Sequence, residues 1–243
     1  MRFCFLTFYL FAIALTNQNL EAQAQAIFKS WFVDFEPFQD GRFVDSELGT
    51  IPEGWRVASL GDIAFYNNEK LPASQAMLDT YISTENMLPN RGGIELASSV
   101  PSTGCVTVFA KNDVLLSNIR PYFRKVWYAS LSGTCSTDVL CFRVKSKVES
   151  EFLFCVLNSE CFFEYIMSGA KGTKMPRGDK RQMMSYRIVM PHQGILENFS
   201  RTLKPLIDHQ RRNTMESHRL AALRDTLLPK LMSGEIDVSE VEV

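Results

Sequence analysis

Two interleaved series of apolar residues run through the C-terminal part of the chain, between residues 196 and 231. One consists of Phe199, Leu206, Leu220 and Leu227, and the other of Leu196, Leu203 and Leu231. This alternating spacing of three and four residues is typical of a coiled-coil seam. The middle of the seam is polar, at Gln210, Asn213 and Ser217. The pattern predicts a long helix that packs either on its own domain or against a second helix.

The ends of this predicted helix follow from glycine and proline. Pro205 is expected to mark either the start of the long helix or a kink after a short first one, because proline lacks the amide donor of a helix interior. Gly234 is expected to end the helix. An asparagine buried in the seam, Asn213, would cost stability but would fix the register and the partner.

A second amphipathic segment lies near the other end of the chain, at residues 19–35. Its apolar stripe comprises Leu20, Ala24, Ile27 or Phe28, Trp31 and Phe35, and Pro37 follows it. This spacing predicts a helix that ends before the proline. The helix would be about half as long as the C-terminal one and, at a rise of about 1.5 Å per residue, would leave part of the longer stripe uncovered. We therefore expect the uncovered leucines to form an interface.

The region between the two helices mixes short strand patterns with one helical pattern. Apolar and β-branched runs predict strands at 81–86, 105–109, 113–117, 126–129, 139–144 and 186–190, and a helix at 151–167 with Phe152, Val156, Phe163 and Ile166 buried. Residues 39–54 are expected to be a loop, 61–66 a capped turn or short strand, and 90–93 a turn. The runs at 105–109 and 113–117 are expected to form a hairpin. The fold class predicted is mixed α/β, of the α+β kind.

Charge is distributed unevenly, although the formal net charge is only −1. Residues 1–53 carry 3 Lys/Arg and 7 Asp/Glu, whereas residues 111–187 carry 13 and 7. Clustered positive charge is what a polyanion partner requires, although a solvated basic face remains the alternative. A hydrophobic fraction of 46% and a charged fraction of 22% are ordinary for a soluble globular protein.

The first fifteen residues, MRFCFLTFYLFAIAL, have the form of a secretory signal. Two A-x-A cleavage sites follow, but both lie inside the predicted N-terminal helix. The run is also too short to span a bilayer. We expect an uncleaved leader, a cytoplasmic protein and no membrane partner, and the alternative of a secreted binding protein rests on residues 1–26 alone.

Two loops carry the candidate chemistry. Residues 116–127, LSNIRPYFRKVW, place amide, guanidinium, ammonium and aromatic groups directly after a strand, and arginine and asparagine can contact guanine and adenine bidentately. Residues 169–181, GAKGTKMPRGDKR, combine lysines and arginines with glycines that allow close approach to a phosphate. We call these segments the basic loop and the glycine loop. Core packing is the alternative for Tyr122, Phe123 and Trp127.

These segments, with AQAIFKSWFVDFEP at 24–37, LGTIPEGWRVASLGDI at 48–63 and LAALRDTLLPKLMSGEI at 220–236, resemble the specificity subunits of type I restriction–modification enzymes. The resemblance covers residues 19–235. It implies half of such a subunit: the tail of a central helix at 18–37, one DNA target-recognition domain at 38–194 and a distal helix at 195–236. Residues 1–17 form an unmatched leader, and 237–243 a tail.

The resemblance implies double-stranded DNA as the ligand, modification and restriction subunits as partners, and pairing of the helices in a homodimer. The expected DNA-binding residues are Ser117, Asn118, Arg120, Tyr122, Arg124, Lys125, Lys171, Thr173, Lys174, Arg177 and Lys180. The expected subunit interface comprises Ile27, Trp31, Leu206, Asn213, Leu220, Leu223, Leu227 and Leu231. The alternative function is that of a truncated half-subunit which pairs through its helices without reading DNA.

No catalytic role is expected. Residues 118–122, NIRPY, are only weakly similar to the NPPY box of adenine methyltransferases, and neither a glycine-rich cofactor turn nor an ATP-binding P-loop accompanies them. His192, His209 and His218 stand at no metal-ligand spacing, and the cysteines form no C-x-x-C pair. We expect neither a cofactor nor a metal.

Overall fold

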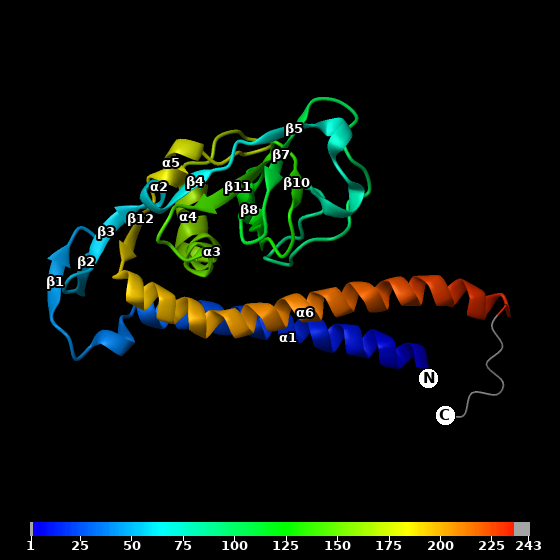
Figure 1. The fold of residues 1–243 in the computed structure, drawn as a ribbon, viewed down its shortest axis with the longest axis horizontal. Helices are drawn as coiled ribbons and strands as arrows, with labels where there is room; N and C mark the ends of the chain where they lie inside the picture. Colours follow the sequence, from blue (N-terminus) through cyan, green and yellow to red (C-terminus); the bar gives the residue numbers. More distant parts are fainter. Residues whose placement is uncertain (1, 236–243) are drawn as a thin grey trace. The chain divides into compact units, whose positions relative to one another are not determined.

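The computed structural model describes residues 2–235, which form two compact units (Figure 1). The helical unit contains Met1–Ala24 and Lys204–Val243, and the mixed unit contains Gln25–Leu203. Two long helices, α1 (Arg2–Phe32) and α6 (Gln193–Met232), contribute to both units. The predicted tail, residues 237–243, lies outside the described residues.

In the helical unit, α1 and α6 run antiparallel. The Nδ2 of Asn213 donates to the Oδ1 of Asn17 over 2.9 Å, and Gln210 donates to Glu21 one turn farther along α1. Asn17 also donates to Thr214 over 3.3 Å. The polar centre of the predicted seam is therefore filled by amide and hydroxyl groups that bond between the two helices.

The predicted lengths of the helices are corrected by the structure. The N-terminal helix begins at Arg2 instead of residue 19, so it has 31 residues against 40 in α6 and is not half as long. The segment predicted as a separate leader is thus part of α1. Helix α6 begins at Gln193 and continues through Pro205, so this proline does not mark the start of the long helix.

The buried stripe of α1 agrees with the prediction at Leu20, Ala24 and Phe28 and differs from it at the C-terminal end, where Phe32 is buried in place of Trp31 and Phe35. Leu20, Ala24, Phe28 and Phe32 are buried, at a constant spacing of four, whereas Ile27 and Trp31 are half-buried. Within the mixed unit, Phe28 and Phe32 pack with Phe199 of α6, and the Phe32 and Phe199 ring centroids are 4.7 Å apart.

The mixed unit starts with small β elements that follow α1. After the 3₁₀ turn η1 (Glu36–Phe38), strands β1 (Phe43–Ser46) and β2 (Gly49–Pro52) form an antiparallel hairpin where a loop was predicted. The prediction was wrong because the turn at Gly49, with φ +93°, reverses a segment rich in Gly and Asp. Strand β3 (Arg56–Ser59) pairs with β12 (Arg187–Met190).

Two four-stranded sheets form the body of the mixed unit. The first has the order β5 (Lys70–Pro72), β7 (Cys105–Phe109), β10 (Gly133–Cys135), β6 (Tyr81–Ile82). The second has the order β4 (Ala64–Tyr66), β11 (Val139–Val144), β8 (Val114–Ser117), β9 (Val126–Tyr128). The 3₁₀ turns η2 (Ala73–Gln75) and η3 (Leu78–Thr80) join β5 to β6.

The hairpin expected from 105–109 and 113–117 does not exist. Both strands form, but β7 pairs with β5 and β10, while β8 pairs with β11 and β9. The chain between them crosses from one sheet to the other. The predicted strand at 81–86 is also shorter than expected, at Tyr81–Ile82.

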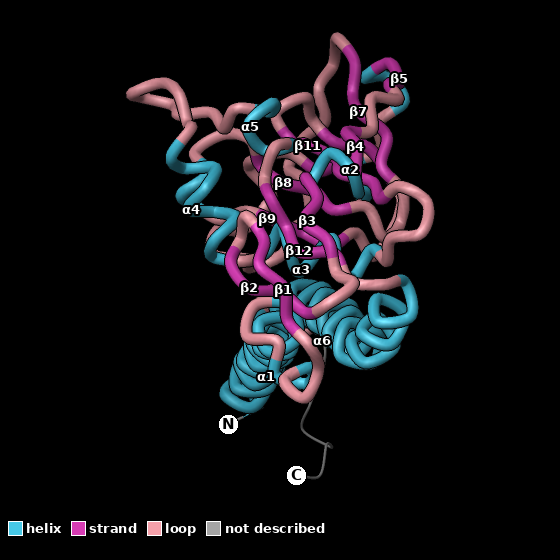
Figure 2. Tube along the Cα trace, turned by 90° about the vertical axis from the view of Figure 1, so that its left-hand side faces the viewer, coloured by secondary structure: helices cyan, strands magenta, loops and turns pink. Residues whose placement is uncertain are grey.

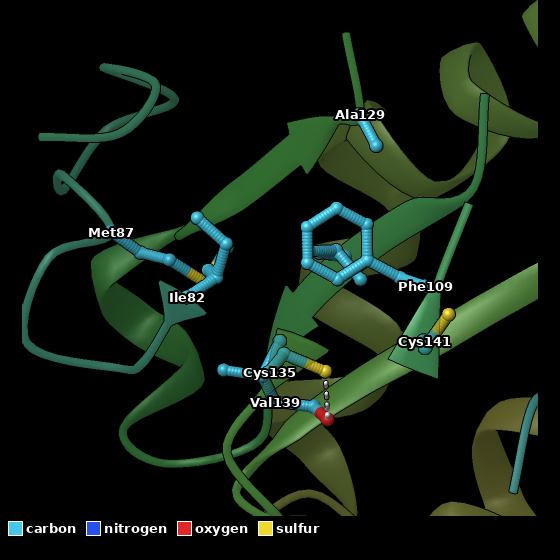
Figure 3. Packing of buried hydrophobic residues seen from close by; sticks show 8 residues of the cluster. Ile82, Met87, Phe109, Ala129, Cys135, Val139 and Cys141 are labelled. Atoms are coloured by element: carbon cyan, nitrogen blue, oxygen red, sulfur yellow. Dashed lines mark hydrogen bonds between the residues drawn. The ribbon is translucent and has the colours of Figure 1, made fainter. Parts of the chain in front are cut away.

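The hydrophobic core of this body is built by both sheets (Figure 3). Ile82, Phe109 and Cys135 come from the first sheet, and Val139 and Cys141 come from the second. Burial raises the pKa of the Cys135 thiol to about 12, so this cysteine is a neutral packing residue. Both sheets therefore contribute to one shared core.

Helices cover the second sheet and carry the loops that follow it. The predicted helix at 151–167 is two helices, α3 (Ser150–Asn158) and α4 (Glu160–Ser168), because Ser159 caps the start of α4 by accepting from the amide of Phe162. The four expected core residues of this segment are all buried. Short helices α2 (Leu60–Ile63) and α5 (Lys180–Met184) complete the unit. The mixed α/β class is confirmed.

Candidate functional site

The structure brings the basic loop and the glycine loop together, although more than forty residues separate them in the sequence. The amide of Arg120 donates to the carbonyl of Pro176 over 2.7 Å, and the amide of Gly178 donates to the carbonyl of Asn118 over 3.2 Å. An isolated β-bridge joins Ile119 to Arg177. The two loops therefore form one continuous surface.

The glycine loop is itself closed at its base. Lys171 and Arg177 exchange two backbone hydrogen bonds of 2.9 Å, which leaves residues 172–176 as its tip. Gly172 has φ +105°, and Gly178 is buried so closely against Met183 that a Cβ would lie 2.1 Å from its Cε. Figure 2 shows this loop between α4 and α5. Glycine is favoured at position 172 because of its positive φ.

The basic loop contains a strained turn around the 3₁₀ element η4 (Pro121–Phe123). Arg120 and Arg124, on either side of η4, have φ of 48° and 51°, a left-handed conformation that is uncommon for residues other than glycine. Such strain persists only when surrounding contacts determine the conformation. We therefore expect contacts that hold this left-handed turn in place.

A second turn supplies those contacts. The amide of Asn90 donates to the carbonyl of Phe123 over 2.7 Å, and the amide of Arg91 donates to that of Arg124 over 3.0 Å. One oxygen of Glu160, Oε1, accepts from Arg91 over 3.3 Å and from Arg124 over 2.9 Å. The turn at 90–93, predicted from the sequence, thus supports the basic loop.

Ser117 and Asn118 occupy positions that differ from the expectation of base contact. Ser117 is 3% exposed and donates to the carbonyl of Ile119, and Asn118 is 6% exposed. Their side chains lie beneath the joined loops. The Oδ1 of Asn118 and the Nε of Arg120 are buried and have no hydrogen-bond partner. Buried polar atoms nearly always have a hydrogen-bond partner, so two such atoms without one are exceptional at the junction of the loops.

Several of the cationic side chains expected to bind DNA form ion pairs or hydrogen bonds within the chain. Arg124 pairs with Glu160, Lys171 with Asp179 over 2.9 Å, and Arg177 with Asp138 over 3.0 Å. The ammonium of Lys125 donates to the carbonyl of Thr84 over 2.6 Å, and burial lowers its pKa. These residues shape the loops, and all but Lys125 remain at least one third exposed on the cation side.

The remaining expected residues of the two loops face solvent. Tyr122 is 46% exposed, and Thr173, Lys174 and Lys180 are exposed as well. Lys180 also lines an open cavity of about 560 Å³, together with Lys70, Arg181 and Tyr66. The hydrogen bond of Lys171, followed by the amides of Gln182 and Arg181, lowers the pKa of Asp179. The arrangement is a basic surface with an aromatic tip.

A comparison with protein families matches residues 52–219 to the type I restriction modification DNA specificity domain. The chain belongs to this family. The match includes both loops, most of the mixed unit and the first part of α6.

Relatives and solved structures agree with the family. The chain is 27% identical to the type I restriction enzyme MjaIX specificity subunit of Methanocaldococcus jannaschii, over 93% of this chain and 55% of that protein. It is 25% identical to the EcoDI specificity subunit of Escherichia coli, over 80% of this chain and 45% of that protein. The fold is similar to that of the S subunit of a type I system from M. genitalium, with a TM-score of 0.60 at 13% identity, over 94% and 58% of the two chains.

The chain spans about half the length of the first curated relatives that it matches. No helix among the described residues is long and apolar enough to cross a membrane. Within residues 2–235, no group of three His, Cys, Asp or Glu side chains could hold a metal ion.

The expected interface residues on the helices differ in exposure. Leu223 is 51% exposed, whereas Leu206, Asn213, Leu220, Leu227 and Leu231 are half-buried. Leu220, Leu227 and Leu231, which a shorter N-terminal helix was expected to leave uncovered, are thus half-buried beside the longer α1. Larger exposed side chains lie on α1, at Phe8, Phe11 and Leu15.

Sequence reasoning missed the residues that hold the loops in place. Arg91, Asp138 and Glu160 contact the basic or glycine loop but lie in other segments. Arg91, Arg120 and Arg124 have positive φ, which is uncommon for arginine and was not expected from the sequence. Phe123, for which core packing was the alternative, is 37% exposed.

Proposed function

We propose that this chain binds double-stranded DNA and reads its sequence through the joined basic and glycine loops, as part of a type I restriction–modification specificity subunit. One observation carries the proposal: two loops with eight Lys/Arg and one acidic residue, Asp179, meet on one surface. Family membership and the names of the relatives support it.

The chemistry of the surface divides into two roles. Lys174 at the tip of the glycine loop and Lys180 after it are exposed ammonium groups, which suit phosphates. Arg120 lies at the junction, where its Nε and the nearby Asn118 Oδ1 are buried without a partner. A guanidinium at that place can contact a base edge bidentately. We assign phosphate contacts to the lysines and base discrimination to Arg120.

The role is one of recognition without catalysis in this chain. The loops supply positive charge, aromatic rings and amides, and the carboxylates of Asp179, Asp138 and Glu160 form ion pairs with their cations. Cleavage and methylation are assigned in this proposal to the restriction and modification subunits.

A salt-dependent binding assay with duplex DNA tests this function. Lys174→Ala and Lys180→Ala should each weaken binding to all sequences and reduce the slope of log K against log salt by about 0.9. Arg120→Ala should instead reduce the preference for the selected target by about 1–3 kcal/mol at one base pair. Lys147→Ala, at an exposed lysine outside both loops, is the control. Unchanged binding in all three loop variants would favour the alternative, a chain that pairs through its helices without reading DNA.

We further propose that the helical unit binds the modification subunit or a second copy of this chain. Exposed Phe8, Phe11 and Leu15 on α1, with Leu223 on α6, supply apolar surface for such an interface. A two-fold pair would place two recognition domains on a near-symmetric DNA site. Phe11→Asp with Leu15→Asp should abolish self-association in sedimentation experiments and leave the mixed unit folded. A clean monomer for the unmutated chain, without the modification subunit, would contradict self-pairing.

A further inference from the structure

The strained turn of the basic loop presents two aromatic rings to solvent. Tyr122 is 46% exposed and Phe123 is 37% exposed, and their ring centroids are 4.7 Å apart. They occupy the middle and end of η4, between the left-handed residues Arg120 and Arg124. The rings sit at an exposed tip, although aromatic side chains usually bury their area.

The turn is held from three directions. Backbone bonds join it to Pro176 of the glycine loop and to Asn90 and Arg91, as described above. Glu160 of α4 binds the guanidinium groups of both Arg91 and Arg124 through one oxygen. The Arg91 guanidinium in turn lies 5.3 Å from the centroid of the Phe163 ring, which is buried. The tip is therefore anchored to the core of the mixed unit and cannot fold away without breaking these contacts.

The charge around the tip favours a polyanion over a protein as its partner. Arg120 and Arg124 flank the rings directly, and the ammonium of Lys125 lies 5.8 Å from the centroid of the Phe123 ring. The glycine loop adds further cations along the same surface, since it is bonded to the basic loop. Apolar side chains surrounded by arginine and lysine match a stacked base step between two phosphate backbones.

We propose that Tyr122 and Phe123 form a wedge that enters a base step of the bound DNA and unstacks it, with Glu160 and Arg91 as the residues that position the wedge. The inference rests on the DNA-binding function proposed above and adds deformation of the duplex to it. Side chains that enter a base step kink the duplex, and the sequence dependence of that deformation adds to specificity without base contacts. A step that is already unstacked should therefore bind more tightly.

The test compares two duplexes of the same sequence, one fully paired and one with a central T·T mismatch. The full chain should bind the mismatched duplex about tenfold more tightly, because a mismatched base is easier to unstack. Tyr122→Ala with Phe123→Ala should bind both duplexes equally and keep the salt slope, since no charge is removed. Phe123→Leu, which keeps an apolar wedge, should retain most of the preference. Leu96→Ala, at another exposed apolar side chain of the mixed unit, should retain all of it.

The positioning role has its own readout. Glu160→Gln should reduce the preference for the mismatch, measured as the ratio of the affinities for the two duplexes. Equal binding of both duplexes by the unmutated chain, or a full preference in the double alanine variant, would overturn the wedge while leaving DNA binding intact. If the double alanine variant lost binding to the modification subunit but kept the preference for the mismatched duplex, the tip would be a protein interface. That result would also overturn the wedge. Absence of binding to either duplex would refute the DNA-binding function itself.

Discussion

At the scale of single residues, one buried carboxylate, Asp113, stands just before β8, the strand that leads to the basic loop. Asp113 is 3% exposed, and it accepts from the Nε and an Nη of Arg143 over 2.8 and 2.7 Å and from the amide of Ala110 over 2.7 Å. The hydrogen bond that Arg143 donates to Asp113 raises the pKa of Arg143.

Asp113→Ala should lower the free energy of unfolding by about 3 kcal/mol, because it leaves a partly buried guanidinium without its partner. The Arg143 side chain is 31% exposed, so water offsets part of the loss, and the value lies at the lower end of the range for such pairs. Urea unfolding measures the effect, and Asp113→Asn, which keeps an acceptor for Ala110, should lose less. A loss below about 1 kcal/mol would show that the pair contributes no more than a surface one.

A second residue-scale prediction concerns Asp179, which caps α5 and pairs with Lys171. Its pKa is lowered from 3.8, first by the hydrogen bond from Lys171. A lowered folded-state pKa means that the group stabilises the fold above its unfolded pKa, and that this contribution is lost as pH falls through the folded pKa. Unfolding experiments below about pH 5 should therefore show a pH dependence that Asp179→Asn reduces. An identical acid profile in the variant would contradict the assignment.

At the scale of elements, local signals and tertiary contacts contribute differently. The apolar spacing in 151–167 predicts four buried residues correctly, but it does not show the break at Ser159. That break depends on a cap: Ser159 accepts from the amide of Phe162 and donates to the carbonyl of Val156. It sets the direction of α4, which carries Glu160.

Ser159→Ala should lower the free energy of unfolding by about 1 kcal/mol, the usual contribution of an N-cap side chain. Ser159→Asp should restore most of it, since a carboxylate can accept the same amide bond. Ser168→Ala, which removes an exposed hydroxyl bonded to Tyr165, serves as the control. Thermal unfolding compares the three variants. Equal melting temperatures for Ser159→Ala and the unmutated chain would mean that packing alone divides α3 from α4.

At the scale of the whole molecule, α1 and α6 carry the surface proposed above for partner binding. Within the helical unit, Asn17 and Asn213 bond across the pair, where an apolar seam would be more stable. Polar residues at such positions fix the register and the partner at a cost in stability. We therefore expect the Asn17–Asn213 contact to disfavour other registers of the two helices.

Asn17→Leu with Asn213→Leu should raise the melting temperature and broaden the range of oligomeric states. Both effects are expected because the variant lacks the polar contact, which costs stability and disfavours other registers. Differential scanning calorimetry and sedimentation velocity measure the two effects, and Thr226→Ala, on an exposed part of α6, is the control. A lower melting temperature with an unchanged oligomeric state would mean that the amide pair stabilises the helices outright.

The sequence by itself determined the elements whose signal is local. Helix and strand periodicities placed α6, most of the strands and the core face of 151–167. The residue types of the basic and glycine loops indicated a surface for binding a polyanion. These features depend on side-chain spacing along one segment, which the sequence contains directly.

Tertiary structure alone decided which segments meet. Strands β7 and β8 are neighbours in sequence but pair in different sheets, and Asn118 is buried because Gly178 approaches it from the glycine loop. The strained turn at Arg120 and Arg124 is held by Arg91 and Glu160. Because these residues lie far from the turn along the chain, the contacts produce no periodic pattern in the sequence. Such contacts follow from the packing of the whole unit, which compensates local strain and selects one pairing among several that the local patterns permit.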